Sequence, residues 1–182
     1  MTDSHGLAPP SAWVIRWAPL VGSGARVLDV ACGAGRHARY LAARGCAVVA
    51  VDRDAAALEG LAGTAGIAPL QADLERDPWP FEAAAFDAVV VTNYLHRPLF
   101  PHLLAALKPS GVLIYETFMA GNAQFGRPSN PDFLLRPGEL AETVAGRLSL
   151  VAFEQGAVRT PKPAAIQRLC AATRDPVTIF LD

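Results

Sequence analysis

The stretch from Val27 to His37, VLDVACGAGRH, constrains the fold more than any other part of the chain. Its valines and leucine favour a strand with no solvated face, which is typical of a buried parallel sheet. Gly33 and Gly35 allow backbone angles that other residues resist, and they let a ligand approach without meeting a Cβ. The residues that follow have the apolar spacing of a helix. A strand, a glycine-rich turn and a helix in this order predict a nucleotide-type binding site.

The composition limits the class of protein. The 182 residues are 52% hydrophobic, which suits one domain with a large core. The net charge of −1 argues against nucleic acid held by a general basic surface. Three isolated cysteines, no secretory signal and no apolar run long enough for a membrane span predict a cytoplasmic location. We therefore expect no membrane or nucleic-acid partner, no metal, and either a monomer or a homodimer.

Predicted strands and helices alternate along most of the chain, which favours an α/β fold with a parallel sheet and helices on both faces. The apolar runs predict strands at 26–30, 47–51, 67–72, 86–92, 111–118, 148–154 and 166–172. The helical patterns fall at 12–18, 35–44, 54–61, 98–107 and 137–145, and a turn is expected at 108–111. No helix separates the last two strands, so a hairpin is expected there. We expect a flexible leader at 1–10 and a single domain at 11–182.

Four polar residues stand at or near the ends of successive predicted strands: Asp29, Asp52, Asp73 and Asn93. The carboxyl ends of parallel strands meet at one edge of a doubly wound sheet, where ligands bind. A single polar residue at a strand end is ordinary, but four in succession indicate one ligand that crosses the sheet edge.

Two of these carboxylates suit the sugar and base of a nucleoside. Asp52 can accept two hydrogen bonds from ribose hydroxyls, although a carboxylate there can also cap the following loop. Asp54 already suits that cap. Asp73 can accept a hydrogen bond from an adenine amino group, and its alternative is a solvated loop carboxylate.

Asp29 and Arg36 distinguish between two nucleotide ligands. The turn also matches the GxGxxA pattern of dinucleotide sites, but Asp29 would repel an anionic pyrophosphate and attract an ammonium group. Arg36 opposes the helix dipole in the first helical turn, which makes sense if it meets a ligand carboxylate; the alternative is a solvated side chain. A ligand with adenine, ribose, ammonium and carboxylate groups is S-adenosylmethionine.

Several motifs together resemble the class I S-adenosylmethionine-dependent methyltransferases: VLDVACGAGRH, VVAVD up to Asp52, QADL around Asp73 and FDAVVVTN up to Asn93. The GAGR turn resembles the tellurite-resistance and thiol methyltransferase branch. The resemblance implies a Rossmann-like seven-stranded sheet of order 3-2-1-4-5-7-6 with the last strand antiparallel. It also implies that Asp29 holds the methionine ammonium, Asp52 the ribose and Asp73 the adenine.

The full set of expected cofactor contacts is Asp29, Ala31, Gly33, Gly35, Arg36, Asp52, Arg53, Asp73, Leu74 and Asn93. Ala31 departs from the commoner family pattern, because a glycine often stands at that position.

Methyl transfer is an in-line displacement, and it needs a base only when the acceptor carries a proton. His96 and Tyr94 follow the fourth predicted strand and are the candidate catalytic residues; each has a purely structural alternative. Glu116 lies inside the fifth strand, where a carboxylate either faces the pocket or pairs with an arginine.

The long loop 119–135 is expected to cover the substrate, because loops of this length in small domains are more often functional than idle. Phe125 and Arg127 are its predicted substrate contacts, together with Glu116 from the preceding strand. Arg127 would suit an anionic substrate.

The sequence therefore predicts methyl transfer from S-adenosylmethionine to a small molecule, such as a thiol, a chalcogen oxyanion or a small metabolite. Two alternatives stay open: a nicotinamide-dependent oxidoreductase, and a non-catalytic S-adenosylmethionine-binding protein.

Overall fold

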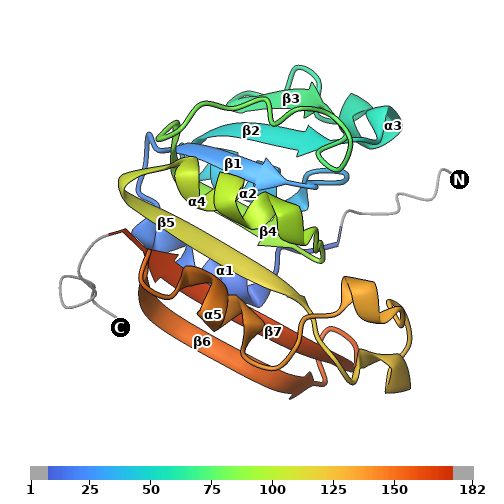
Figure 1. Cartoon of the computed structure of the whole chain (residues 1–182). Coiled ribbons are helices and arrows are strands. Elements are labelled where there is room, and N and C mark those ends of the chain that lie inside the picture. The colour runs from blue at the N-terminus through green and yellow to red at the C-terminus, as the bar shows by residue number, and fades with distance from the viewer. Residues whose placement is uncertain (1–7, 174–182) are drawn as a thin grey trace, which may run out of the picture.

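The computed structural model describes residues 8–173 and contains a single seven-stranded sheet (Figure 1). Its order is β3-β2-β1-β4-β5-β7-β6, as predicted. The strands are β1 (Arg26–Val30), β2 (Ala47–Asp52), β3 (Ile67–Gln71), β4 (Phe86–Thr92), β5 (Leu107–Phe118), β6 (Ser149–Val158) and β7 (Ala164–Ala172). The pairs among β1 to β5 are parallel, and β7 is antiparallel to both of its neighbours. The predicted hairpin of the last two strands is confirmed.

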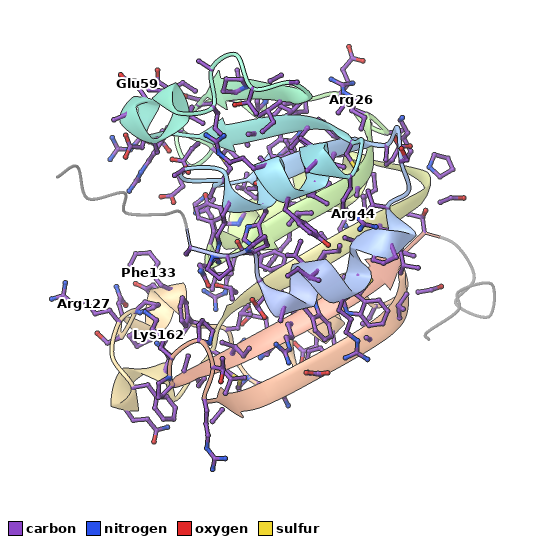
Figure 2. All side chains as sticks on the ribbon, turned by 180° about the vertical axis from the view of Figure 1, so that it is seen from behind. Arg26, Arg44, Glu59, Arg127, Phe133 and Lys162 are labelled. Carbon is purple, nitrogen blue, oxygen red and sulfur yellow. The ribbon has the colours of Figure 1, made fainter. Side chains whose placement is uncertain are left out.

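Helices cover both faces of the sheet (Figures 1 and 2). One core includes side chains of α1 (Ala12–Trp17), α2 (Arg36–Ala43) and α3 (Ala55–Glu59). The other core includes side chains of α4 (Phe100–Ala105) and α5 (Glu139–Val144). Short 3-10 helices lie at Ala18–Leu20, Arg97–Leu99, Asn122–Gln124 and Pro131–Phe133. The sheet is thus buried on both sides, which explains the continuous apolar runs in its central strands.

The turn predicted at 108–111 is wrong. β5 begins at Leu107, and its pairing with β4 shifts register between Phe86 and Ala88. Ser110 has a φ of +67°, a left-handed conformation inside this irregular stretch. A bulge of this kind keeps a strand paired while it absorbs extra residues, so glycine and proline mark an irregularity here and not a strand end.

The leader predicted at 1–10 lies mostly outside the described residues, since residues 1–7 are not among them. Within 8–173, no helix has the length and apolar character needed to cross a bilayer. The same range holds no group of three or more side chains suited to a metal ion.

Candidate functional site

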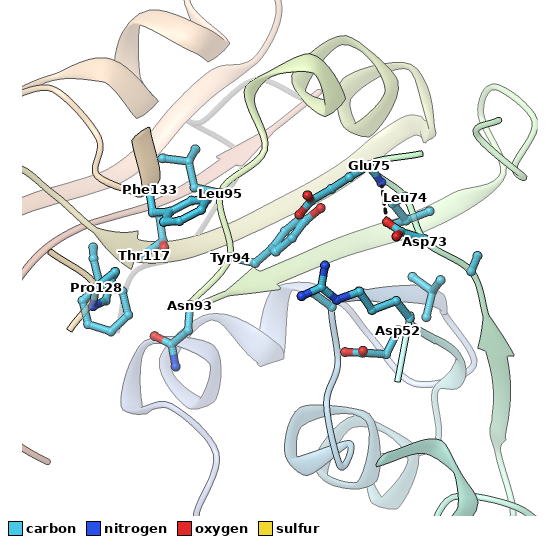
Figure 3. A pocket seen from close by; sticks show the side chains of 15 residues that line it. Asp52, Asp73, Leu74, Glu75, Asn93, Tyr94, Leu95, Thr117, Pro128 and Phe133 are labelled. Carbon is cyan, nitrogen blue, oxygen red and sulfur yellow. Dashed lines mark hydrogen bonds between the residues drawn. The ribbon is translucent and has the colours of Figure 1, made fainter. Parts of the chain in front are cut away.

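A pocket of about 400 Å³ lies across the carboxyl ends of five neighbouring strands (Figure 3). Its lining follows the order of the sheet: Ala72 to Glu75 after β3, Val51 to Arg53 at β2, Ala31 after β1, Asn93 to Leu95 after β4, and Thr117 and Phe118 at the end of β5. Pro128 and Phe133 complete the lining from the loop beyond β5. A pocket of this size and place suits a nucleoside-sized ligand with space beside it.

The structure brings about half of the predicted site residues into this lining: Ala31, Asp52, Arg53, Asp73, Leu74, Asn93 and Tyr94. It places the others outside the lining: Asp29, Gly33, Gly35, Arg36, His96, Glu116, Phe125 and Arg127. The lining residues that the sequence did not predict are mostly apolar: Val51, Ala72, Glu75, Leu95, Thr117, Phe118, Pro128 and Phe133.

Asp52 joins the glycine turn to the end of β2. Its Oδ2 atom accepts a hydrogen bond of 2.8 Å from the Gly33 N–H, and its Oδ1 atom accepts one of 2.9 Å from the Asp54 N–H. Asp54 accepts from the N–H groups of Ala56 and Ala57 and is the cap of α3. Asp52 therefore has lone pairs left for a ligand, and its carboxylate is fixed at the centre of the pocket's polar end.

Gly33 and Gly35 have different reasons to be glycine. Both have positive φ, +53° and +75°. A Cβ on Gly35 would lie 2.5 Å from a methyl carbon of Leu61, so Gly35 allows α2 to pack closely. A Cβ on Gly33 would meet nothing within 4 Å, so the space above this turn is open. The open space at Gly33 fits the close approach of a ligand, whereas Gly35 serves the core.

Ala31 adopts the backbone conformation that a glycine would prefer, with a φ of +52°. Alanine in place of the commoner glycine thus keeps the shape of the turn, but the left-handed conformation strains its backbone. We expect Ala31→Gly to leave the free energy of unfolding unchanged or to raise it by up to about 1 kcal/mol, because relief of strain outweighs the extra chain entropy. Ala34 lies in the same turn, but its φ is not positive. Ala34→Gly should therefore lower the free energy of unfolding by about 0.5–1 kcal/mol. Thermal unfolding of the pair checks this, and equal losses would contradict it.

Asp29 is a buried carboxylate with an orphan oxygen. Its Oδ2 atom has no hydrogen-bond partner among the described residues. Burial raises the pKa of Asp29 to about 7, although the Ala38 N–H and the Arg36 charge oppose the shift. A buried acceptor without a partner is costly, so a cationic ligand group beside it would be stabilising. This orphan, with the open turn at Gly33 and the fixed Asp52, fits S-adenosylmethionine.

The start of α2 is tied to the residues before α1. The Arg36 guanidinium donates to the Pro9 carbonyl at 3.3 Å, and the Ser11 N–H donates to His37 Nε2 at 3.1 Å. Thr92 Oγ1 lies 3.2 Å from His37 Nδ1. Burial lowers the pKa of His37 to about 4, so the ring is neutral at physiological pH. His37 thus has a structural role: it joins the start of α2 to Ser11 and Thr92.

Asp73 begins a short turn after β3. Its Oδ1 atom accepts from the Glu75 N–H at 3.1 Å, and the Arg76 guanidinium lies 3.9 Å from its Oδ2. The carboxylate lines the pocket beside Leu74, which is buried. The turn holds the pair at the far end of the pocket from the loop beyond β5 (Figure 3).

The two candidate catalytic residues have different positions. Tyr94 lines the middle of the pocket (Figure 3), and burial together with the charges of Glu75 and Asp73 raises its pKa. The phenol therefore stays protonated near neutral pH and is a donor, not a base. His96 precedes the 3-10 helix Arg97–Leu99, and it does not line the pocket.

Glu116 adopts one of the two arrangements that the sequence left open. Its Oε1 atom accepts from the Ser11 hydroxyl at 2.7 Å, and its Oε2 atom lies 3.3 Å from Arg168 Nη1. Arg168 also pairs with Glu154 at 2.6 Å. The carboxylate is thus engaged with an arginine across the sheet, and it is not a pocket residue. Its partner lies 52 residues away in the chain, so no local sequence signal indicates the pairing.

The loop 119–135 does reach the pocket, but through residues other than those predicted. Asn122 is buried and holds the loop: it donates to the Pro128 carbonyl at 2.9 Å and accepts from the Ala165 N–H at 3.0 Å. This anchor directs Pro128 into the pocket wall. Phe125 and Arg127 are exposed outside the lining, and Figure 2 shows Arg127 on the outer surface.

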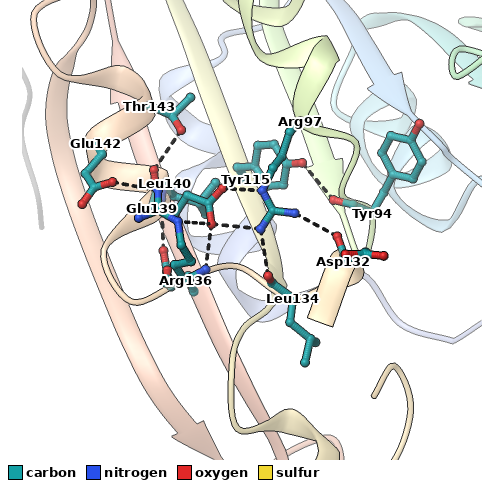
Figure 4. A network of polar contacts seen from close by, with 11 residues as sticks. Tyr94, Arg97, Tyr115, Asp132, Leu134, Arg136, Glu139, Leu140, Glu142 and Thr143 are labelled. Atoms are coloured by element: carbon teal, nitrogen blue, oxygen red, sulfur yellow. Dashed lines mark hydrogen bonds and ion pairs between the residues drawn. The ribbon is translucent and has the colours of Figure 1, made fainter. Parts of the chain in front are cut away.

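Arg97 connects this loop to α5 and to the segment after β4 (Figure 4). Its guanidinium contacts both carboxylate oxygens of Glu139, at 2.6 and 3.0 Å, and donates to the carbonyls of Asp132 and Leu134 at 2.8 and 2.9 Å. Burial alone would raise the pKa of Glu139, but hydrogen bonds from Arg97 and the Arg136 N–H hold it below its usual value. The ion pair therefore fixes the far end of the loop, next to the pocket residue Phe133.

The sheet order and the strand-end pocket define the fold of the S-adenosylmethionine-dependent methyltransferases, as the sequence predicted. Residues 27–111 match a family model described as a methyltransferase domain. The chain is thus similar to S-adenosylmethionine-dependent methyltransferases in fold and in the segment that the model matches.

Three known proteins illustrate this similarity. The chain is 33% identical to a tRNA U34 carboxymethyltransferase of Methylococcus capsulatus, over 71% of this chain and 45% of that protein. It is 36% identical to a demethylmenaquinone methyltransferase of Clavibacter sepedonicus, over 50% of this chain and 40% of that protein. The crystal structure of TehB from Haemophilus influenzae superposes with a TM-score of 0.77 at 17% identity, over 91% of this chain and 63% of that one. The chain spans less than half the length of the two curated relatives that it matches.

Proposed function

We propose that this protein transfers a methyl group from S-adenosylmethionine to a small molecule. The observation that carries the proposal is the pocket, with a carboxylate fixed at the end of β2 and an apolar wall from the loop 119–135. Behind the lining, at the end of β1, the buried Asp29 has an orphan carboxylate oxygen. The net charge of −1 gives no general basic surface for a nucleic acid, which favours a small acceptor.

Each end of the pocket has a separate task. Asp52 would hold the ribose, Asp73 and Leu74 the adenine, and Asp29 the ammonium group. When bound, S-adenosylmethionine supplies a methyl group on a positively charged sulfur. The protein contributes alignment and exclusion of water, since a displacement at carbon needs little more when the acceptor has no proton to lose.

Calorimetric titration with S-adenosylhomocysteine, with NADH as the parallel control, tests the cofactor. Micromolar binding of S-adenosylhomocysteine alone is expected. Binding of NADH alone would favour a nicotinamide-dependent oxidoreductase. A product from any acceptor in a panel would eliminate a non-catalytic binding role.

The affinity for S-adenosylhomocysteine should rise with pH through the region of the pKa of Asp29, about 7. The ligand ammonium prefers the ionised carboxylate, so binding is weakened where Asp29 is protonated and strengthened where it is ionised. Titrations at pH 6, 7 and 8 measure this, and Asp29→Asn is the control that should flatten the profile. An equally steep profile in Asp29→Asn would assign the proton to another group.

Removal of residues 125–129 from the loop should reduce methyl transfer more than it reduces cofactor affinity. The deletion takes away Pro128 and shifts Phe133, whereas Asp52 and Asp73 keep their own turns. Turnover and S-adenosylhomocysteine affinity are measured on the same preparation. Equal losses of both would exclude a substrate-covering role for the loop.

A further inference from the structure

We infer that the acceptor is an uncharged, apolar molecule whose methyl-accepting atom is a nitrogen of the pyridine type, with a free electron pair and no proton. This inference rests on the proposed methyl transfer and specifies its substrate class. It differs from the thiols and chalcogen oxyanions that the sequence suggests, and it follows from the lining of the pocket.

The two ends of the pocket differ in chemistry (Figure 3). Asp52, Asp73 and Glu75 lie at one end, and Tyr94 lies in the middle. Leu95, Pro128 and Phe133 lie at the other end, where Asn93 and Thr117 are uncharged polar neighbours. Phe118 adds a further aromatic side chain to the lining. If the adenosine occupies the acidic end, the acceptor meets the apolar end, and a flat apolar body gains most from burial there.

No cation is available for an anionic acceptor at that end. Arg53 is the one basic residue among the described residues that line the pocket, and it lies beside Asp52 at the end of β2. Arg97 is fully engaged by Glu139 and two carbonyl groups. Arg127 is exposed and outside the lining. The lining carries three carboxylates against one guanidinium, so it disfavours an oxyanion.

At the apolar end, where Leu95, Pro128 and Phe133 lie, the described lining offers no general base for a protonated acceptor. The raised pKa of Tyr94 keeps its phenol protonated, and His96 lies outside the lining. A pyridine-type nitrogen needs no base. Its electron pair forms the new bond to the methyl carbon while the carbon–sulfur bond breaks, and the bonding pair stays on sulfur. No proton leaves, and the positive charge passes from sulfur to the acceptor nitrogen.

The resulting cation suits this pocket. The lining holds three aromatic residues, Tyr94, Phe118 and Phe133, and aromatic rings stabilise a positive ring nitrogen; the carboxylates of the lining have the opposite charge. An anionic acceptor would instead lose its charge on transfer and gain nothing from these groups.

The test compares quinoline with quinoline-4-carboxylate, which share a ring and differ in charge. Their binding to the protein saturated with S-adenosylhomocysteine is measured by calorimetry, and methyl transfer from S-adenosylmethionine by mass spectrometry. We expect quinoline to bind about tenfold or more tightly than the carboxylate and to give N-methylquinolinium. Equal or tighter binding of the carboxylate, binding of selenite, or no binding of quinoline would overturn the inference. In each of these outcomes the proposed methyl transfer still stands if S-adenosylhomocysteine binds. If S-adenosylhomocysteine does not bind, both the proposed methyl transfer and the inferred acceptor class are refuted.

Two variants locate the effect in the acceptor end. Phe133→Ala should weaken quinoline binding about tenfold and change S-adenosylhomocysteine affinity less than about twofold. Leu150→Ala on β6, another exposed apolar side chain, is the control and should change neither. Glu75→Gln should narrow the preference for quinoline over the carboxylate, while Glu59→Gln on α3 should not. An unchanged preference in Glu75→Gln would show that the lining charge does not select the acceptor.

Discussion

The Asp52→Ala variant is expected to bind S-adenosylhomocysteine at least tenfold more weakly than the unmodified protein, with a loss of about a hundredfold if two ribose hydrogen bonds are removed. The carboxylate is the ribose acceptor in the proposed site, and it also fixes the Gly33 N–H at 2.8 Å. The variant thus loses both a ligand contact and the order of the turn. Calorimetric titration measures the affinity, and thermal unfolding measures the cost to the fold.

Asp87→Ala is the matched control for Asp52→Ala. Asp87 also accepts from a backbone N–H, that of Arg26 at 2.8 Å, and from a second group, Lys108 at 3.0 Å. It stands at the start of β4, at the opposite edge of the sheet from the pocket. This variant should lose stability and keep its affinity. Unchanged affinity in Asp52→Ala, or an equal loss in Asp87→Ala, would show that the ribose site lies elsewhere.

Arg97→Met is expected to lower the free energy of unfolding by about 3 kcal/mol, because it leaves the buried Glu139 carboxylate without its main partner. The same change frees the carbonyls of Asp132 and Leu134, so the loop beyond β5 loses its fixed position. Turnover should fall more than cofactor affinity. Thermal unfolding, turnover and S-adenosylhomocysteine titration measure the three effects.

Arg136→Met is the control that distinguishes loss of the Arg97–Glu139 ion pair from loss of any positive charge near Glu139. The Arg136 side chain also lies near Glu139, at 3.6 Å, but it is 68% exposed, so its removal should cost less than about 1 kcal/mol. In the double variant Arg97→Met/Glu139→Met, an apolar pair replaces the ion pair, and most of the lost stability should return. Equal effects of Arg97→Met and Arg136→Met would contradict a special role for Arg97.

The parts of the site that depend on strand ends were predictable from the sequence. Asp52, Asp73 and Asn93 each follow an apolar run, and parallel strands bring their carboxyl ends to one edge. Local patterns therefore predict the strands and the polar end of the pocket, whereas the sheet order followed from the resemblance of the motifs to a known family.

The apolar end was not predictable in the same way. The sequence of the loop does not indicate whether Phe125 or Phe133 lines the pocket. Which of the two does so depends on how the loop is anchored by Asn122 and Arg97. These anchors use backbone groups of distant segments, which carry no residue-type signal. For the same reason, the sequence could not determine whether Glu116 faces the ligand or Arg168.

The place of β7 has a consequence for how the chain is made. β7 follows β6 in the chain, yet it lies between β5 and β6, and β6 has no other partner among the described strands. A chain emerging from the ribosome can assemble β1 to β5 early, but β5 keeps an open edge until Ala172 has been synthesised. Open edges recruit strands from other chains. The period of greatest exposure to aggregation thus lies between the synthesis of β5 and that of β7, and a nascent chain that stalls before Ala164 would present that edge for as long as it stalls.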